Sequence, residues 1–396
     1  MKFVIAVGDG MADEYIEKLG NKTPLEFADT PNLDLVAQKG ICGMVNLIPD
    51  GFPPASDIGN MSIMGYDPQK YHTGRAPIEA ASLGIKLEQG ETAFRCNLVT
   101  IKNEIMDDYS AGHITTESAE KIISQLKKLN CEKYRFYLGT QYRHILVVKN
   151  IILKEPPLTP PHDISGQIVR NFEPRNEILK QIRKKAHEII ENCDENKKRI
   201  EAGQKPVTDI WLWGEGKAAR YPSLKERYGI TGAVISAVDL VKGIGVLGGM
   251  EIVNVEGATG YLGTNYAGKI AACREMLKKH DFVYIHLEAP DETAHEGDLD
   301  KKIQAIEEYD KFIVGEIIKM RKEFNHLSVM VLPDHPTFVR TRTHAQGKVP
   351  FAVFGEKIPI GSSTSYCERS GNESRIVIKS GEELFDKFIR GGFVFG

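Results

Sequence analysis

Long hydrophobic runs are missing from this sequence. Its longest apolar segments, such as Phe3–Val7 and Phe351–Phe354, are far shorter than the roughly 18 residues that a membrane-spanning helix requires. Met1 and Lys2 lead directly into a strand-like run, without the basic region, apolar core and small-residue cleavage site of a secretory leader. We therefore expect a soluble protein that is not exported and has no membrane partner.

An excess of one charge is also missing. The 396 residues include 51 Lys+Arg and 54 Asp+Glu, which gives a formal net charge of -3. This balance argues against a basic field over the whole surface, so we expect no nucleic-acid partner. The six cysteines are widely scattered and form no C-x-x-C pair, which argues against a disulfide framework. Free thiols in a reducing cytoplasm are the expectation.

Strand-like and helix-like segments alternate near both ends of the chain. Short apolar runs at Phe3–Val7, Phe282–Leu287 and Leu327–Leu332 are typical of strands that are buried on both faces. Helical periodicity covers Tyr266–Lys279 and Lys301–Lys322. This alternation predicts an α/β fold with a mostly parallel sheet flanked by helices.

The middle of the chain has a different pattern. It contains short strands such as Ile145–Val148 and a basic-rich helix over Asn176–Gln204. We interpret residues 94–225 as a smaller α+β domain inserted into a main domain formed by residues 1–93 and 226–396. Residues 101–225 contain 22 Lys+Arg against 17 Asp+Glu, so the insert is basic and suits an anionic substrate, whereas the remainder is acidic.

Carboxylate and imidazole side chains follow several of the predicted strands. One such residue alone is more often a turn former, a helix cap or a helix-face pair than a ligand. Together they would meet at the carboxyl edge of a parallel sheet, where their charges would repel one another without cations. Two divalent metal ions resolve this conflict and suit in-line displacement at phosphorus. Mn²⁺ or Zn²⁺ is favoured, and Mg²⁺ or Co²⁺ also fits; the residues are Asp9, Asp291, His295, Asp334, His335 and His344.

Ser56 is a candidate nucleophile. It precedes a predicted helix over Asp57–Met64, where its structural role would be that of an N-cap. A serine at a helix N-terminus can also attack a phosphate that the backbone N–H groups hold, and a coordinated metal ion favours its alkoxide. Both roles are compatible.

Several residues are candidates for binding an anionic substrate, although Arg and Lys are more often solvated surface residues. Lys242 lies where the chain has re-entered the main domain. It could reach a transferred phosphate, or it could act only as a helix-end cation. The candidates within the insert are His113, Arg143, His162, Asp163 and Lys217.

The order of the motifs resembles the archaeal-type cofactor-independent phosphoglycerate mutases of the alkaline phosphatase superfamily. The similarity covers essentially the whole chain. Its motifs are Gly8-Asp9-Gly10-Met11-Ala12-Asp13, Lys22-Thr23-Pro24-Leu25, Thr30-Pro31-Asn32-Leu33-Asp34, Ser56-Asp57, Gly65-Tyr66-Asp67-Pro68, Thr73-Gly74-Arg75-Ala76-Pro77-Ile78-Glu79-Ala80, Trp211-Leu212-Trp213-Gly214, Ile235 to Gly245, Asp291 with His295, and Asp334-His335 with His344.

The resemblance implies an alkaline-phosphatase-like fold and a division of the metal ligands between two ions. One ion would be held by Asp9, Ser56, Asp334 and His335, and the other by Asp291, His295 and His344. It further implies that Ser56 accepts the phosphoryl group, that Lys242 stabilises its charge, and that 3-phosphoglycerate and 2-phosphoglycerate are interconverted without 2,3-bisphosphoglycerate. The partner would be a small phosphorylated anion, and no particular oligomeric state is implied.

Other functions stay open at this point. The archaeal enzymes usually have His where Asn60 stands, and Gly8–Asp13 looks more like a bacterial sister group that has been proposed to phosphorylate homoserine. A homoserine-directed phosphotransferase would use the same metals. A phosphatase or phosphonate hydrolase would admit water, and a metal-binding scaffold protein would not need Ser56.

Overall fold

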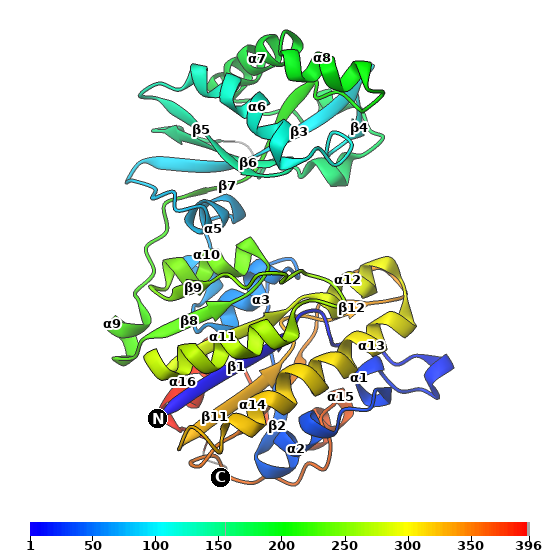
Figure 1. Ribbon diagram of the computed structural model, residues 1–396, viewed down its shortest axis with the longest axis vertical. Coiled ribbons are helices and arrows are strands. Elements are labelled where there is room, and N and C mark those ends of the chain that lie inside the picture. The colour runs from blue at the N-terminus through cyan, green and yellow to red at the C-terminus, as the bar shows by residue number, and fades with distance from the viewer. Residues whose placement is uncertain (155, 394–396) are drawn as a thin grey trace. The chain divides into compact units, whose positions relative to one another are not determined.

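The computed structural model describes residues 1–154 and 156–393. They form two compact units, which are described separately (Figure 1). The main unit comprises Met1–His72 and Tyr221–Gly396, and the inserted unit comprises Thr73–Arg220. In the described part of the chain, no helix combines the length and the apolar character needed to cross a membrane.

The main unit contains an eight-stranded, mostly parallel sheet, as the alternating pattern predicts. Strand β14 is antiparallel to both of its neighbours, β11 and β2, and the other pairings are parallel. In spatial order the strands are β15 (Val377–Ile378), β2 (Ile41–Val45), β14 (Val349–Phe354), β11 (Leu327–Leu332), β1 (Lys2–Gly8), β10 (Phe282–Leu287), β8 (Gly232–Ile235) and β9 (Glu251–Val253).

Strand β1 lies at the centre of this sheet. Val4 pairs with Val283 of β10 on one side and with Val329 of β11 on the other. The three strands are almost wholly buried, because helices cover both of their faces, which explains their continuous apolar sequences. Their parallel direction places the residues that follow Gly8, Leu287 and Leu332 at one edge of the sheet.

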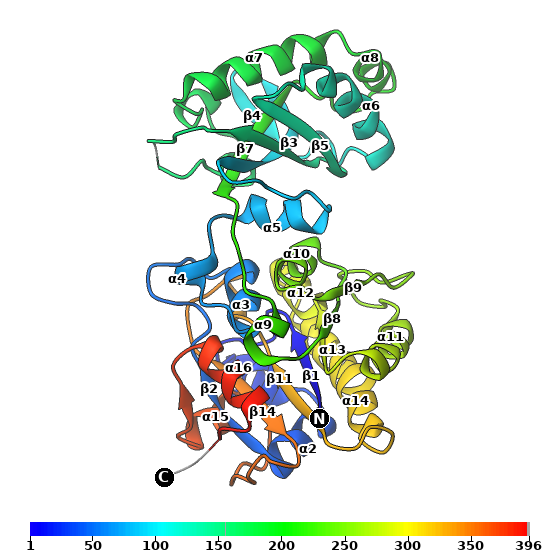
Figure 2. The same cartoon turned by 90° about the vertical axis from the view of Figure 1, so that its left-hand side faces the viewer.

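Helices form a layer on each side of this sheet (Figure 2). Apolar side chains of α2, α11, α13 and α14 pack with Val4 and Ala6 of β1. On the opposite face, the rings of Phe3 and Phe282 contact Phe388 and Phe385 of α16. The bounds are α2 (Pro31–Lys39), α11 (Tyr266–Lys279), α13 (Leu299–Tyr309) and α14 (Gly315–Met320) for the first layer, and α3 (Ser56–Ile63), α10 (Asp239–Leu247) and α16 (Gly381–Arg390) for the second.

Shorter elements complete the main unit. Helix α12 and the hairpin of β12 and β13 lie beyond the carboxyl ends of the central strands. The bounds are η1 (Glu17–Leu19), α1 (Pro24–Phe27), α4 (Pro68–Tyr71), α9 (Leu224–Tyr228), α12 (Ala289–Glu296), β12 (Thr337–Phe338), β13 (Thr343–His344) and α15 (Glu368–Glu373).

The helix predicted over Lys301–Lys322 is interrupted by a π-helical turn, η5 (Asp310–Val314), between α13 and α14. The Asp310 carboxylate accepts hydrogen bonds from the backbone N–H groups of Asn32 (3.3 Å) and Leu33 (2.6 Å). Asp310 therefore caps α2, whose own N-cap, Thr30, makes no side-chain capping bond. The periodicity of the sequence does not reveal such a long-range cap.

The inserted unit is an antiparallel five-stranded sheet with helices on both faces. Helices α6 and α7 share one apolar core with the sheet, and α5 packs on the other face through Ala76 and Ala80. The strands are β3 (Glu91–Lys102), β4 (Ile105–Asp108), β5 (Tyr134–Thr140), β6 (Arg143–Lys149) and β7 (Asp209–Lys217); the helices are α5 (Arg75–Ser82), α6 (Thr116–Leu126), η2 (Lys127–Leu129), η3 (Pro161–Ile164), η4 (Val169–Asn171), α7 (Glu177–Glu191) and α8 (Asp194–Glu201).

Two sequence-based boundaries need correction. The insert begins at Thr73 rather than at residue 94, because α5 packs on β3 and β7 and because β3 already starts at Glu91. It ends at Arg220 rather than at residue 225, since the carbonyl oxygen of Pro222 accepts a hydrogen bond from Tyr66 of the main unit. The single basic helix expected over 176–204 is two helices, α7 and α8.

Candidate active site

The predicted metal-binding residues gather at the carboxyl edge of the main sheet. Asp9 follows β1, Asp334 and His335 follow β11, and Asp291 and His295 lie on α12, which follows β10. The hairpin of β12 and β13 brings His344 to the same edge, and α3 brings Ser56. Ser56 occupies the first turn of α3 and Ala55 the N-cap position, so the expected capping role of Ser56 is wrong.

The Nε2 atom of His335 is the centre of the first group of ligands. It lies 3.2 Å from Oγ of Ser56, 3.5 Å from Oδ1 of Asp9 and 3.5 Å from Oδ2 of Asp334. His335 and Asp334 are fully buried, and Asp9 is almost so. The four residues that the resemblance assigns to one metal ion are therefore neighbours in space.

The second group is also assembled. Nε2 of His295 lies 3.2 Å from Oδ2 of Asp291 and 3.0 Å from Nε2 of His344, and His344 lies 3.5 Å from Oδ1 of Asp291. One donor atom from each residue lies within 4.8 Å of the other two. A second triad with this spacing, formed by Asp9, Asp291 and His335, joins the two groups.

The ring orientations of His295 and His344 suit metal binding. Nδ1 of His295 lies 2.9 Å from the carbonyl oxygen of Arg342, and Nδ1 of His344 lies 3.1 Å from that of Pro54. A carbonyl oxygen only accepts hydrogen bonds, so both Nδ1 atoms must carry a proton. In the neutral ring Nε2 then keeps its lone pair, which is the arrangement of a metal-binding histidine.

The negative charge of the first group of ligands would favour a bound cation. Burial, followed by the nearby charges of Asp334, Asp291 and Glu288, raises the pKa of Asp9 well above its usual value. Oδ1 of Asp9 is buried and receives no hydrogen bond within residues 1–154 and 156–393. A buried carboxylate oxygen without a donor is costly unless a positive charge faces it. Carboxylates and imidazoles together are suitable ligands for Mn²⁺ or Zn²⁺.

Protonation competes with a metal ion in the second group. Burial opposes ionisation of Asp291, but hydrogen bonds from His295 and His344 hold its pKa well below its usual value. The hydrogen bond to Asp291 raises the pKa of His295 to about 9. Since a metal ion needs the Nε2 lone pair that this proton occupies, metal affinity at this group falls as the pH falls.

Sequence reasoning missed His286, a fully buried residue of β10. Its Nε2 lies 3.0 Å from Oδ2 of Asp9, and burial lowers its pKa to about 4, so the ring is neutral and donates to Asp9. His286 lies within the predicted apolar strand Phe282–Leu287. An imidazole inside such a strand is the signal that could have identified it.

Asn60 connects the nucleophile helix to the metal-binding edge. Its Nδ2 donates to Oδ2 of Asp334 (2.7 Å) and to the carbonyl oxygen of Ser56 (2.9 Å). The Tyr284 hydroxyl donates to Oδ1 of Asn60 (2.6 Å). At the sequence level Asn60 is only a departure from the family, whereas in the structure its side chain makes three hydrogen bonds.

Lys242 lies on α10, which packs against α3. The Lys242 ammonium is 3.5 Å from Oδ1 of Asp239 on its own helix, and its side chain is only 17% exposed. Lys242 therefore lies on the helix beside that of Ser56, and its ammonium pairs with the carboxylate of Asp239.

Four of the five predicted substrate-binding residues form a cluster in the inserted unit. Contacts with the rings of Tyr109, Tyr142 and Trp213 connect the four residues, which are His113, Arg143, His162 and Asp163. Lys217 lies apart at the exposed end of β7, where its carbonyl oxygen accepts a hydrogen bond from Thr73. In the described part of the chain, no hydrogen bond, ion pair or ring contact joins its side chain to the cluster.

A partly buried ion network adjoins this cluster. Arg95 lies 2.8 Å from Glu79 and stacks over the Trp213 ring at 4.1 Å, and Arg75 lies 2.9 Å from Glu79. Burial opposes ionisation of Glu79, but Arg95 and Arg75 hold its pKa below the usual value. Arg75 and Glu79 belong to the Thr73–Ala80 motif, which carries part of the family resemblance.

Comparison with known proteins identifies the family. The family model described as 2,3-bisphosphoglycerate-independent phosphoglycerate mutase matches residues 37–196. A protein of that name from Methanosarcina barkeri is 45% identical over 396 residues, which cover 98% of this chain and 100% of the relative. The chain belongs to this family. A member named as probable, from Geobacter sulfurreducens, is 42% identical and covers 98% of this chain and 100% of its own length.

Solved structures share the fold with this family member. A protein from Pyrococcus horikoshii matches with a TM-score of 0.83 and 26% identity, over 100% of this chain and 99% of that one. A cofactor-independent phosphoglycerate mutase from Thermoplasma acidophilum matches with a TM-score of 0.66 and 24% identity, over 98% of this chain and 99% of that one. These likenesses confirm the α/β fold with its inserted unit.

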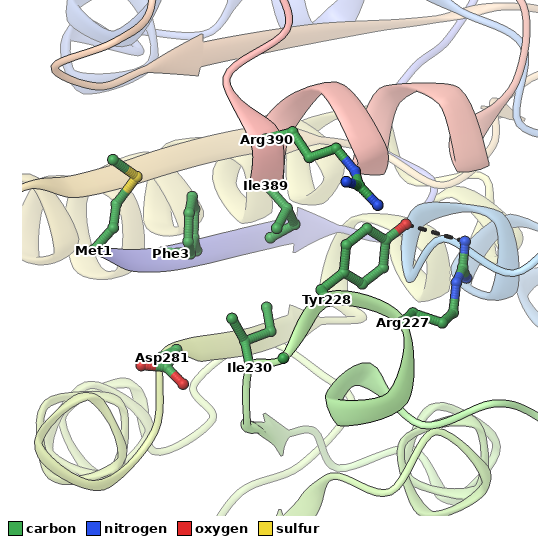
Figure 3. A pocket seen from close by; sticks show the side chains of 9 residues that line it. Met1, Phe3, Arg227, Tyr228, Ile230, Asp281, Ile389 and Arg390 are labelled. Atoms are coloured by element: carbon green, nitrogen blue, oxygen red, sulfur yellow. Dashed lines mark hydrogen bonds between the residues drawn. The ribbon is translucent and has the colours of Figure 1, made fainter.

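The phosphoglycerate mutase family member also has a pocket of about 410 Å³ at the opposite edge of the main sheet (Figure 3). Met1, Phe3 and Asp281 line it where β1 and β10 begin. The Tyr228 ring packs against the guanidinium groups of Arg227 and Arg390, at 5.0 and 5.4 Å. None of the predicted site residues lines this pocket.

Proposed function

We propose that this protein is a metal-dependent 2,3-bisphosphoglycerate-independent phosphoglycerate mutase, which interconverts 3-phosphoglycerate and 2-phosphoglycerate in glycolysis and gluconeogenesis. The observation that carries the proposal is the 3.2 Å contact between Oγ of Ser56 and Nε2 of His335 inside the carboxylate and imidazole cluster. Membership of the family names the reaction, and this contact supports Ser56 as its nucleophile.

Two divalent metal ions would be held by the two groups of ligands. Asp9, Ser56, Asp334 and His335 would hold one, and Asp291, His295 and His344 the other. Mn²⁺ or Zn²⁺ is favoured by the mixture of carboxylate and imidazole, and Mg²⁺ or Co²⁺ remains compatible. When bound, such ions favour the Ser56 alkoxide and neutralise the phosphoryl oxygens.

Ser56 performs the transfer in two steps. Its oxygen attacks phosphorus in line with the glycerate oxygen that leaves, so an Oγ–P bond forms as the glycerate O–P bond breaks. The other glycerate hydroxyl then attacks phosphoserine, and Ser56 leaves. Lys242, on the helix beside α3, would offset the charge on the transferring phosphoryl group.

The substrate-binding residues of the insert would retain glycerate between the two steps. Arg143 would bind its carboxylate, and His113, His162 and Asp163 would orient its hydroxyl groups. Lys217 would contribute charge only. Water must be excluded while glycerate is retained, because water would hydrolyse phosphoserine and release phosphate. The partner is thus a small phosphorylated anion, and the six unpaired cysteines, five of them buried, support a cytoplasmic location.

The test is a phosphorus NMR time course with 3-phosphoglycerate, Mn²⁺ and no bisphosphoglycerate. We expect 2-phosphoglycerate to accumulate to equilibrium with inorganic phosphate at background. Phosphate release faster than isomerisation would instead identify a phosphatase. A parallel reaction with ATP and homoserine should give no phosphohomoserine; its formation without isomerisation would contradict the mutase.

A further inference from the structure

Thr337 touches one ligand from each metal-binding group. It begins β12 and is fully buried, between α12 and the end of β11. Its Oγ1 lies 2.5 Å from Oδ1 of Asp291 and 3.1 Å from Nδ1 of His335. Asp291 belongs to the second group of ligands and His335 to the first, so a single hydroxyl group bridges them.

Counting protons fixes the direction of both hydrogen bonds. A hydroxyl group has one proton to donate and lone pairs to accept with. The Asp291 carboxylate only accepts, so Thr337 must donate its proton there. The bond to His335 must then run the other way, with Nδ1–H of the imidazole donating to Oγ1 of Thr337.

We propose that Thr337 is a positioning residue that sets the tautomer of His335 and links the two metal-binding groups. With the proton held on Nδ1, Nε2 of His335 carries the lone pair that faces Ser56, Asp9 and Asp334. This inference rests on the proposed metal-dependent function. The inference adds that the orientation of His335, in the first group of ligands, depends on the carboxylate of Asp291, in the second.

His335 differs in this respect from the other two histidine ligands. Nδ1 of His295 and Nδ1 of His344 are each held by a backbone carbonyl oxygen, which no side-chain substitution removes. Nδ1 of His335 depends on a hydroxyl group that could donate or accept. The bond from Thr337 to Asp291 commits that hydroxyl group to accepting from His335, whose ring also interacts with the backbone carbonyl oxygen of Pro336.

Thr337 is itself held firmly. Its backbone N–H donates to the carbonyl oxygen of Ala12 (3.0 Å), and its own carbonyl oxygen accepts from Nζ of Lys302 (2.7 Å). Lys302 forms an ion pair of 2.8 Å with Asp13, and both side chains are fully buried. The hydroxyl position is therefore imposed by the backbone, and serine at this position would keep it.

The tautomer can be read directly from metal-free protein with ¹⁵N-labelled histidine. Two-bond proton–nitrogen correlation spectra, assigned with a His335→Gln variant, should show His335 as the Nδ1–H tautomer. Thr337→Ser should keep this pattern, and Thr337→Val should lose it. An Nε2–H pattern for His335 in the unaltered chain would overturn the proposal, whatever the enzyme's activity.

Metal binding provides the second readout. Titration of Mn²⁺ into the metal-free protein, with elemental analysis, should show at least a roughly 10-fold weaker affinity in Thr337→Val, the range typical of lost outer-shell partners. Thr337→Ser should bind as tightly as the unaltered chain. Thr293→Val is the matched control, because the Thr293 hydroxyl is buried on α12 and, among the described residues, bonds to the carbonyl oxygens of Ala289 and Pro290 and not to a predicted metal ligand.

The outcomes separate this inference from the proposed function. Equal affinity in Thr337→Val and Thr293→Val would overturn the positioning role while leaving the mutase intact. If the unaltered chain binds no Mn²⁺ or Zn²⁺, the metal-dependent function fails, and the NMR spectra still decide the tautomer. Should Thr337→Val not fold, the Thr337→Ser affinity and the spectra of the unaltered chain decide the question.

Discussion

Oγ of Ser56 lies 3.2 Å from Nε2 of His335, although 279 positions separate the two residues in the chain. The approach is possible because helix α3 meets the loop after β11 at Gly59. A Cβ atom at Gly59 would lie 2.6 Å from the carbonyl oxygen of Asp334, which is too close for any side chain. The motif therefore needs a glycine one turn after the serine so that the nucleophile reaches its ligands.

Removing the hydroxyl group of Ser56 should abolish phosphoryl transfer. We expect Ser56→Ala to lower kcat by about 10³-fold or more, because the variant lacks the oxygen that accepts the phosphoryl group in the proposed mechanism. Metal content should stay close to that of the unaltered chain, since two carboxylates and His335 remain in the first group. Steady-state assays and elemental analysis of the same preparation check both expectations.

The control for this variant lies on the same helix. The Ser62 hydroxyl is buried and donates to the carbonyl oxygen of Leu47 (2.6 Å), so Ser62→Ala tests the loss of a serine hydroxyl from α3. It should cost about 1 kcal/mol of stability and little activity. Equal turnover in Ser56→Ala and Ser62→Ala would contradict the assignment of the nucleophile.

Metal ions should stabilise the main unit, and Asp9 should be required for this. A ligand at 100 times its Kd adds about 2.7 kcal/mol of stability, which corresponds to a rise in Tm of roughly 5–10 °C for a unit of this size. In metal-free protein, Asp9→Asn should match or exceed the Tm of the unaltered chain, because it removes one of several repelling buried carboxylates.

Differential scanning calorimetry with EDTA and with Mn²⁺ checks this pair of expectations. The unaltered chain should show the shift and Asp9→Asn should lose most of it. A lower Tm of Asp9→Asn in EDTA would mean that the carboxylate stabilises the fold by itself, contrary to the electrostatic argument.

The sequence predicted the sheet edge well because strand ends are local features. Asp9, Asp334 and His335 each follow an apolar run whose burial and parallel direction could be inferred, so their convergence followed. Asp291 and His295 were placed by their spacing on one helix. The positions of these residues can be predicted without knowing how the side chains around them pack.

Residues inside regular elements escaped prediction for the opposite reason. His286 and Tyr284 alternate with apolar residues in β10, and their roles depend on Asp9, which follows β1, and on Asn60 of α3. The same holds for Thr337, whose importance comes from two contacts across chain separations of 46 and 2 residues. The boundary of the insert was misplaced because α5, at the start of the insert, packs onto strands of the insert rather than onto the main sheet.

Asn60 should be needed for the position of Asp334. Asn60→Asp would place a carboxylate 2.7 Å from that of Asp334, and we expect at least a roughly 10-fold loss of kcat together with lower stability in metal-free protein. Tyr284→Phe removes only the hydroxyl group that donates to Asn60, and should cost about 1–2 kcal/mol with smaller effects on turnover. Urea unfolding and kcat measurements on both variants distinguish the two effects. If Asn60→Asp and Tyr284→Phe had equal kcat, the role of Asn60 would be refuted.

Arg143 should act on substrate binding. It is exposed, lies over the Tyr142 ring at 5.2 Å and belongs to the substrate cluster of the insert. Arg143→Met should raise KM for phosphoglycerate by about 10-fold or more, the cost of one charged hydrogen bond. Arg170→Met, at another exposed position of the insert, is the control and should change KM less than about twofold. If both variants behave alike, Arg143 is not a substrate contact.

The stability of the inserted unit should fall in acid because of His144. This residue of β6 is 2% exposed, and burial lowers its pKa to about 3, against about 6.5 in an unfolded chain. Between these two values the unfolded state binds a proton that the folded state does not. Stability is therefore unaffected above pH 7 and falls progressively below about pH 6.5.

The expected size of this effect follows from the two pKa values. Between pH 7 and pH 5 one such histidine costs about 2 kcal/mol of unfolding free energy. His144→Asn should remove this part of the pH dependence, because Asn cannot be protonated in this range and its Oδ1 can still accept the hydrogen bond that Gly139 N–H donates to Nδ1 of His144 (3.1 Å). Urea unfolding in EDTA at pH 5, 6 and 7, followed by the fluorescence of Trp211 and Trp213, reports on this unit because both tryptophans lie in its core. The same loss of stability in His144→Asn as in the unaltered chain would assign the acid sensitivity to other groups.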